Sequence, residues 1–149
     1  MEMAREMMGV RVDRVGAFAY RALPVPRIQA NEVLIRVEVT GLCRTDLKII
    51  RSGHRDLVLP RVPGEGGGGI VVETGSRVAG SAVGDRVYVY PGIWCGRCPI
   101  CQKGADNLCP QMRIMGFHRD GGFARYVAAP AASLLHVPEG LSAEQAVFA

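Results

Sequence analysis

Four cysteines lie within one short stretch of the chain at a spacing that suits a metal ion. They follow the pattern C-x2-C-x2-C-x7-C, at Cys95, Cys98, Cys101 and Cys109. Thiolates are soft ligands, and four of them form a closed tetrahedral zinc site with Zn–S distances of about 2.3 Å. Because no ligand position is left for water, we expect a structural zinc site in the segment 94–110.

An iron–sulfur cluster is the alternative for these cysteines. Bacterial ferredoxins use C-x2-C-x2-C-x3-C-P, and Pro110 follows Cys109 here as well. The last gap is seven residues instead of three, and no second cluster motif is present. The spacing therefore favours zinc.

A second group of reactive side chains precedes this segment. The stretch GLCRTD at 41–46 contains a cysteine, a hydroxyl and a carboxylate, and GEGGGGIV at 64–71 contains Glu65 within a run of glycines. The run also satisfies G-x-G-x-x-G, which in dinucleotide-binding proteins must open a helix. Here the apolar residues of a predicted strand follow, so we expect a close approach of backbones and no nucleotide site.

Several segments resemble, in the same order, the motifs of the medium-chain zinc-dependent alcohol dehydrogenases. Besides the cysteine spacing, they are 41–46 (GLCRTD), 69–75 (GIVVETG), 83–87 (VGDRV), 120–127 (DGGFARYV) and 137–142 (VPEGLS). The resemblance implies that 1–149 is a GroES-like β-barrel catalytic domain, mainly β with short helices and a four-cysteine zinc lobe. In that family a Rossmann NAD(P)-binding domain follows, and we expect it to lie outside this chain.

The resemblance also assigns roles around a catalytic zinc ion. Cys43 matches the first zinc ligand. Asp46 matches a carboxylate that does not touch the zinc ion but orients a histidine that does. Thr45 matches the hydroxyl that relays the alcohol proton, and Lys48 lies where some members place a further relay group. The family's ligand histidine is replaced here by Glu65. A carboxylate can bind zinc at about 2.0–2.2 Å, so Glu65 is a candidate ligand.

Two alternatives stay open at this site. Glu65 would be a solvated side chain in a flexible glycine run if no catalytic zinc binds. His54, eleven residues after Cys43 in a predicted loop, is either solvated or a further metal ligand or acid–base group.

Alternating apolar residues predict the elements that position these groups. We expect strands over 9–15, 17–23, 32–40, 70–74, 85–90, 123–128 and 134–137, and a short helix over 45–51. The segment 94–110 lacks periodicity and reads as a loop. Ser142 and Gln145 form a capping-box pattern that should open a helix. With 19 glycines and nine prolines, these short elements predict a mainly β fold.

Composition excludes several classes of function. The net charge of +4 comes from scattered basic residues without a run of five or six, so we expect no nucleic-acid partner. No apolar window reaches 18 residues, so we expect no membrane span. No signal peptide is visible, and clustered thiols suit a reducing compartment, so we expect a cytoplasmic protein.

The expected parent enzyme transfers hydride between a small alcohol or polyol and NAD(P), and it can associate as a homo-oligomer like its relatives. The chain 1–149 alone should be inactive, because nothing in it can hold the dinucleotide. Two other functions remain open: a zinc-stabilised module without catalysis, and an enoyl or quinone reductase of the same superfamily.

Overall fold

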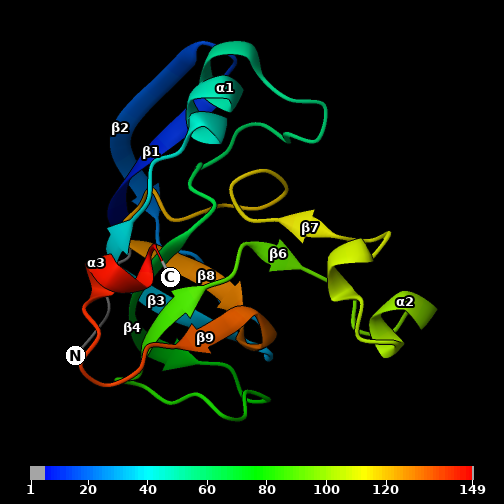
Figure 1. Cartoon of the computed structure of the whole chain (residues 1–149). Helices are drawn as coiled ribbons and strands as arrows, with labels where there is room; N and C mark the ends of the chain where they lie inside the picture. The colour runs from blue at the N-terminus through cyan, green and yellow to red at the C-terminus, as the bar shows by residue number, and fades with distance from the viewer. Residues whose placement is uncertain (1–5, 149) are drawn as a thin grey trace.

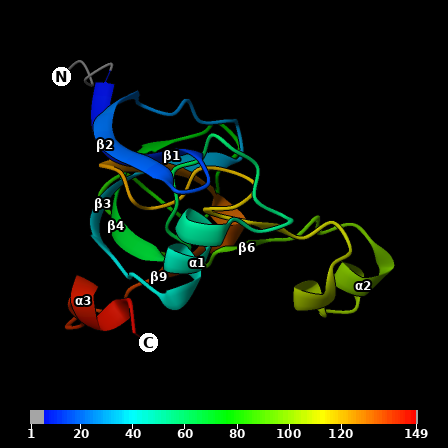
Figure 2. The same ribbon diagram turned by 90° about the horizontal axis from the view of Figure 1, so that it is seen from above.

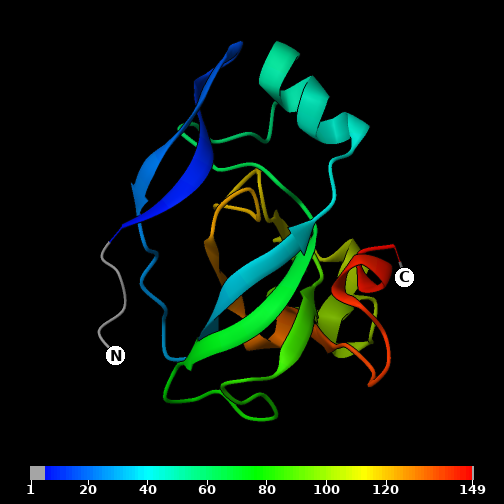
Figure 3. The same ribbon diagram turned by 90° about the vertical axis from the view of Figure 1, so that its left-hand side faces the viewer.

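A computed structural model describes residues 6–148 of the chain (Figure 1). Its centre is a five-stranded antiparallel sheet with the strand order β8-β3-β4-β5-β9. The strands are β3 (Glu32–Thr40), β4 (Gly67–Thr74), β5 (Arg86–Val89), β8 (Tyr126–Pro130) and β9 (Leu134–His136). Figure 3 shows β3, β4 and β5 running side by side and curving together.

The mainly β class expected from the sequence is confirmed. Within residues 6–148 the sheet is not a closed barrel, because β8 and β9 are its two edges and are not paired with each other. A separate hairpin of β1 (Glu6–Arg14) and β2 (Ala17–Pro24) packs beside the sheet. Single bridges from Gly9 to Ala124 and from Val12 to Arg61 connect this hairpin to the rest of the fold.

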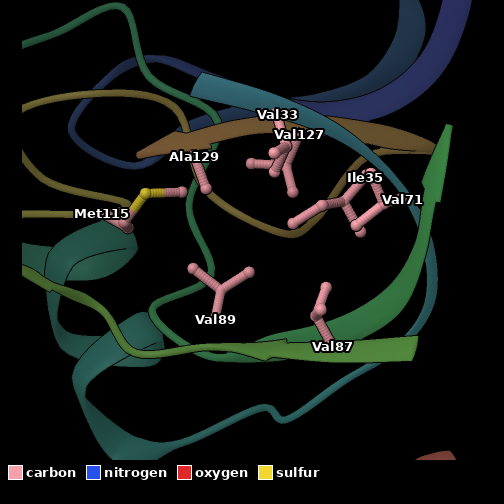
Figure 4. Packing of buried hydrophobic residues seen from close by; sticks show 8 residues of the cluster. All are labelled: Val33, Ile35, Val71, Val87, Val89, Met115, Val127 and Ala129. Carbon is pink, nitrogen blue, oxygen red and sulfur yellow. The ribbon is translucent and has the colours of Figure 1, made fainter. Parts of the chain in front are cut away.

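The hydrophobic core lies on the concave side of this curved sheet (Figure 4). Alternate residues of β3 and β5 point into it, as period-two patterns require. The cluster contains Val33, Ile35, Val71, Val87, Val89, Met115, Val127 and Ala129.

The buried carboxylate of Glu32 is paired with the half-buried Arg119. Glu32 is 4% exposed, and its Oε1 accepts a hydrogen bond from Arg119 Nη1 at 2.7 Å. Its Oε2 accepts from the backbone N–H of Gln29 at 3.0 Å, and Arg119 Nη2 donates to the carbonyl of Ala128 at 3.1 Å. The pair therefore joins the start of β3, the strand β8 and the loop that precedes β8.

The four-cysteine segment forms a lobe that projects from the sheet (Figures 1 and 2). The two-residue strands β6 (Gly92–Ile93) and β7 (Arg113–Ile114) pair at its base. The expected loop also contains two short helical turns, α2 (Pro99–Gln102) and η1 (Asp106–Leu108). Elements of two to four residues are too short to leave a periodic pattern in the sequence.

Short helices complete the described chain. Helix α1 (Arg44–Ser52) follows β3, η2 (Ala131–Ser133) separates β8 from β9, and α3 (Ala143–Ala146) closes the segment. The predicted capping box of α3 is confirmed, since Ser142 Oγ accepts from the Gln145 N–H and Gln145 Oε1 accepts from the Ser142 N–H. None of the helices in residues 6–148 has the length and apolar character that a membrane crossing requires.

Candidate metal centres

The pairing of β3 with β4 brings two distant segments together. Thr40, the last residue of β3, lies opposite Gly67, the first residue of β4. The Thr40 hydroxyl donates to the carbonyl of Gly66 at 2.6 Å, and the Gly41 N–H donates to the same carbonyl at 3.3 Å. Cys43 and Glu65, 22 positions apart in the sequence, therefore lie at the same end of this strand pair.

Helix α1 fixes the first of these segments. Cys43 is the N-cap of the helix, and Asp46 is the third helical residue. The Oδ2 atom of Asp46 accepts a hydrogen bond from the Cys43 N–H at 2.9 Å, which is one half of a capping box. Asp46 is 0% exposed, and its Oδ1 atom has no hydrogen-bond partner.

Cys43, Asp46 and Glu65 form the first candidate metal centre. One donor atom from each residue lies within 4.8 Å of the other two, and Cys43 Sγ lies 3.9 Å from Glu65 Oε1. Burial and the neighbouring Asp46 carboxylate raise the pKa of Glu65, although hydrogen bonds from Thr45 and Cys43 oppose the shift. A buried carboxylate with one partnerless oxygen, beside a second carboxyl group and a cysteine sulfur, offers a set of ligands that fits a divalent cation.

The glycine run next to Glu65 is required by close packing. A Cβ atom at Gly69 would overlap the carbonyl oxygen of Arg36, and one at Gly68 would lie 2.9 Å from the carbonyl oxygen of Val87. The run leads into β4, so the expected strand and the expected close approach of backbones are both confirmed. A helix N-terminus for a dinucleotide is not formed by these residues.

Tyr88 was missed by the sequence analysis. A Cβ atom at Gly66 would lie 2.7 Å from the Tyr88 hydroxyl, so this hydroxyl fills the space that a side chain at position 66 would need. Burial, followed by the charge of Glu65, raises the pKa of Tyr88. Val87 and Val89 point into the core, which places Tyr88 on the opposite face of β5. The alternation of apolar residues along β5 could have placed Tyr88 on this face. Its contact with Gly66, however, follows only from the register of β4 against β5.

The remaining predicted catalytic residues divide into two groups. Thr45 lies on α1 near Glu65, since its side chain acts to lower the pKa of that carboxyl. Lys48 lies exposed on α1. The His54 ring packs edge-on against Phe117 at 5.4 Å, and its Nδ1 accepts from the Asp56 N–H at 3.2 Å. His54 and Lys48 are thus outside the cluster of three donors.

Cys95, Cys98, Cys101 and Cys109 form the second candidate centre. Their sulfur atoms all lie within 4.8 Å of one another; Cys98 and Cys101 are 3.5 Å apart and Cys95 and Cys101 3.9 Å. Four sulfurs at about 2.3 Å from one ion would be separated by about 3.8 Å. The donor set and its spacing therefore fit a tetrahedral zinc ion.

The local backbone favours ionised sulfur at this centre. Cys98 is the N-cap of α2, and its sulfur accepts from the Cys101 N–H at 3.4 Å. Hydrogen bonds from the backbone N–H groups of Arg97 and Cys98 lower the pKa of Cys95 to about 6. Burial instead raises the pKa of Cys101 to about 12. Without a cation the buried thiol keeps its proton, so the four thiolates together require a metal ion.

A cavity of about 540 Å³ lies elsewhere, between the β1–β2 hairpin and the sheet. Arg27, Arg119 and Asp120 are among its lining residues, whereas neither metal centre contributes to it. The residues of both candidate metal centres therefore lie outside this cavity.

Comparison with known proteins adds a family to this geometry. The family model of the alcohol dehydrogenase GroES-like domain matches residues 29–139. The probable alcohol dehydrogenase AdhA of Mycobacterium tuberculosis is 40% identical over 132 residues, which are 79% of this chain and 36% of that protein.

Two solved structures superpose closely. A putative zinc-binding dehydrogenase from Sinorhizobium meliloti 1021, bound to NADP, has a TM-score of 0.85 and 40% identity, with 93% of this chain and 40% of that one covered. An alcohol dehydrogenase (rspB) from Escherichia coli CFT073, complexed with NADH, has a TM-score of 0.89 and 32% identity, covering 97% of this chain and 42% of that one. The chain thus spans 36% to 42% of the length of these proteins.

Proposed function

Because this chain belongs to the alcohol dehydrogenase family through its GroES-like domain, we propose that it is the catalytic domain of a zinc-dependent oxidoreductase. In the longer protein it would transfer hydride between a small alcohol or polyol and NAD(P). The observation that carries the proposal is the convergence of Cys43, Asp46 and Glu65 at the end of the β3–β4 pair. This cluster differs in donor type from the four-cysteine lobe, which suits a structural zinc ion.

The residues around the cluster suit the handling of an alcohol. A zinc ion held there would act as a Lewis acid and polarise the oxygen of the bound alcohol. Cys43 is exposed, so the cluster is open to a small substrate. The Thr45 side chain lies close enough to Glu65 to lower the pKa of that carboxyl, and its hydroxyl would pass on the alcohol proton. We propose that Lys48, exposed on the same helix, takes a later place in that relay.

The hydride acceptor needs a separate binding unit. Every pair of neighbouring strands described in residues 6–148 is antiparallel, unlike the parallel sheets that bind dinucleotides. We therefore propose that 1–149 is one domain, that NAD(P) binds elsewhere in the longer protein, and that this chain alone is inactive.

Kinetic assays of the longer protein and of the chain 1–149 test this proposal. With NAD⁺ or NADP⁺, the longer protein should oxidise members of an alcohol and polyol panel, whereas 1–149 should not. Cys43→Ser should lower the rate at least about 100-fold, because it removes the thiolate ligand. Reduction of activated alkenes without alcohol oxidation would instead support the reductase function.

A second function is favoured by one observation, the carboxylate of Glu65 at the position of the family's ligand histidine. If this position no longer holds a catalytic metal ion, the chain is part of a zinc-stabilised module without catalysis. Turnover by the longer protein contradicts this second function. A single zinc ion per chain together with no turnover supports it.

A further inference from the structure

The position of Asp46 in the first turn of α1 explains the contact of only one of its two buried carboxylate oxygens. Its Oδ2 atom holds the Cys43 N–H at 2.9 Å, which accounts for one oxygen only. The Oδ1 atom is buried without a hydrogen-bond partner. A buried carboxylate oxygen without a donor is strongly unfavourable, so a missing positive group is indicated beside it.

Glu65 in its ionised form cannot supply that group. An ionised carboxylate only accepts hydrogen bonds, whereas the histidine that usually occupies this position in the family would donate one to Asp46. Neither Asp46 nor Glu65 takes part in an ion pair of the described residues. Two carboxyl groups and a thiol therefore share a partly buried space without a positively charged partner among the described residues.

The separation of the donors matches one shared ion. Atoms bound at about 2.0–2.3 Å to the same cation lie about 3–4.5 Å apart. The three donor atoms lie within 4.8 Å of one another, and the sulfur lies 3.9 Å from Glu65 Oε1. Small side-chain shifts would place all three in contact with one ion.

We infer that Asp46 is itself a metal ligand, so that Cys43, Asp46 and Glu65 bind one divalent cation through a thiolate and two carboxylates. The inference rests on the proposed catalytic metal at this cluster, and it changes the ligand set from the one that the family resemblance implies. A set with two carboxylates is harder than four thiolates, so this centre accepts Co²⁺ or Mn²⁺ more readily than the cysteine lobe does.

Cobalt binding to the purified 149-residue chain tests the inference without any assay of activity. With the cysteine lobe filled by zinc, added Co²⁺ should bind one further site per chain and give a thiolate-to-cobalt absorption band from Cys43. Asp46→Asn keeps an oxygen that can accept the Cys43 N–H but loses the charge and the ligand. It should weaken Co²⁺ binding at least about 100-fold.

Two further variants separate a ligand from a positioning residue. In a Glu65→His background, Asp46 has an imidazole N–H to accept, and the additional Asp46→Asn change should cost only about 10–100-fold in affinity. Asp13→Asn, at an exposed carboxylate of the hairpin, should leave Co²⁺ affinity unchanged. Circular dichroism checks that each variant is folded.

Two results would overturn the inference. One is Co²⁺ affinity in Asp46→Asn within about 10-fold of the unchanged chain, and the other is no second cobalt site at all, which would indicate carboxylates that share a proton. Neither result requires the longer protein to lack alcohol oxidation. Conversely, absence of turnover in the longer protein would overturn the proposed function and leave these binding measurements standing.

Discussion

At the scale of single residues, the Glu32–Arg119 pair gives a clear test of what a buried charge contributes. Glu32→Ala removes the acceptor of both Arg119 and the Gln29 N–H. Because Arg119 keeps 31% of its side chain exposed, water partly replaces the lost partner. We expect a loss of about 2–3 kcal/mol in the free energy of unfolding, measured by urea denaturation.

Glu38→Ala is the matched control. Its ion pairs with Arg36 and Arg86 are long, at 3.8 and 3.5 Å, so the expected loss is below about 1 kcal/mol. Equal losses in the two variants would show that burial of Glu32 adds nothing to its interaction with Arg119.

Single residues also show which part of the candidate sites can be predicted from sequence. The four cysteines stand within 15 positions, so their spacing alone indicates a shared ion. Cys43 and Glu65 required the family resemblance, because only the pairing of β3 with β4 brings them together. Tyr88 could not be found, since the approach of its hydroxyl to Gly66 depends on the register of β4 against β5, in which Tyr88 lies opposite Gly68.

At the scale of elements, the contact between Gly66 and Tyr88 couples the start of β4 to β5. A methyl group at Gly66 would lie 2.7 Å from the Tyr88 hydroxyl but 3.6 Å from the ring carbon that bears it. Gly66→Ala should therefore cost about 1–3 kcal/mol through overpacking. In a Tyr88→Phe background the same change should cost below about 1 kcal/mol.

Thermal and urea unfolding of the two single variants and the double variant measure this coupling. If the losses in unfolding free energy of the two single variants simply add in the double variant, the coupling is contradicted. The cost of Gly66→Ala would then come from separation of the strands and not from contact with the Tyr88 hydroxyl. The single variant Tyr88→Phe measures the cost of removing the hydroxyl alone, and the double variant is compared with it.

The sequence pattern predicted every strand of the five-stranded sheet, including the short β5 and β9, but not the two-residue strands β6 and β7 or the helical turns α2 and η1. The strand 32–40 was predicted with the bounds that β3 has, because its alternation is regular over nine residues. Strand β4 begins three residues before the predicted start, since glycines carry no hydrophobic signal. Strand β8 begins at Tyr126, three residues later than expected. The residues Phe123 and Ala124 instead pack against a small buried cluster of Met7, Leu23 and Val62.

At the scale of the whole molecule, the cysteine lobe and the sheet are two structural units with different sources of stability. The sheet encloses an apolar core, whereas we propose that the lobe is stabilised by a zinc ion bound to its four cysteines. Metal binding to such small sites is worth about 10–16 kcal/mol in isolated zinc-binding peptides. Removal of zinc should therefore unfold the lobe and leave the sheet folded.

Hydrogen exchange after treatment with a strong zinc chelator measures this separation. Amides within 94–110 should lose their protection, while those of β3 and β4 should keep it. Cys101→Ser should reproduce the chelator's effect without any chelator, and Ser76→Ala, in the turn after β4, should not. Loss of protection throughout the chain would show instead that lobe and sheet unfold as one unit.

The mainly β class followed from composition and alternation, but the open edges of the sheet did not. Whether β8 and β9 meet depends on the accumulated twist and bulges of the whole sheet, which no local pattern contains. The direction in which the lobe projects depends similarly on the two-residue ribbon of β6 and β7.

The register of β3 against β4 determines which side chains meet at the end that the two strands share. Each residue advances a strand by about 3.4 Å and reverses the face of its side chain. Two irregularities in the pairing of β3 with β4 already set the offset between the two strands. One inserted residue in either strand would carry Cys43 and Glu65 out of reach of a common ion. Evolution should therefore tolerate length changes in the segment 53–63 far better than within this strand pair.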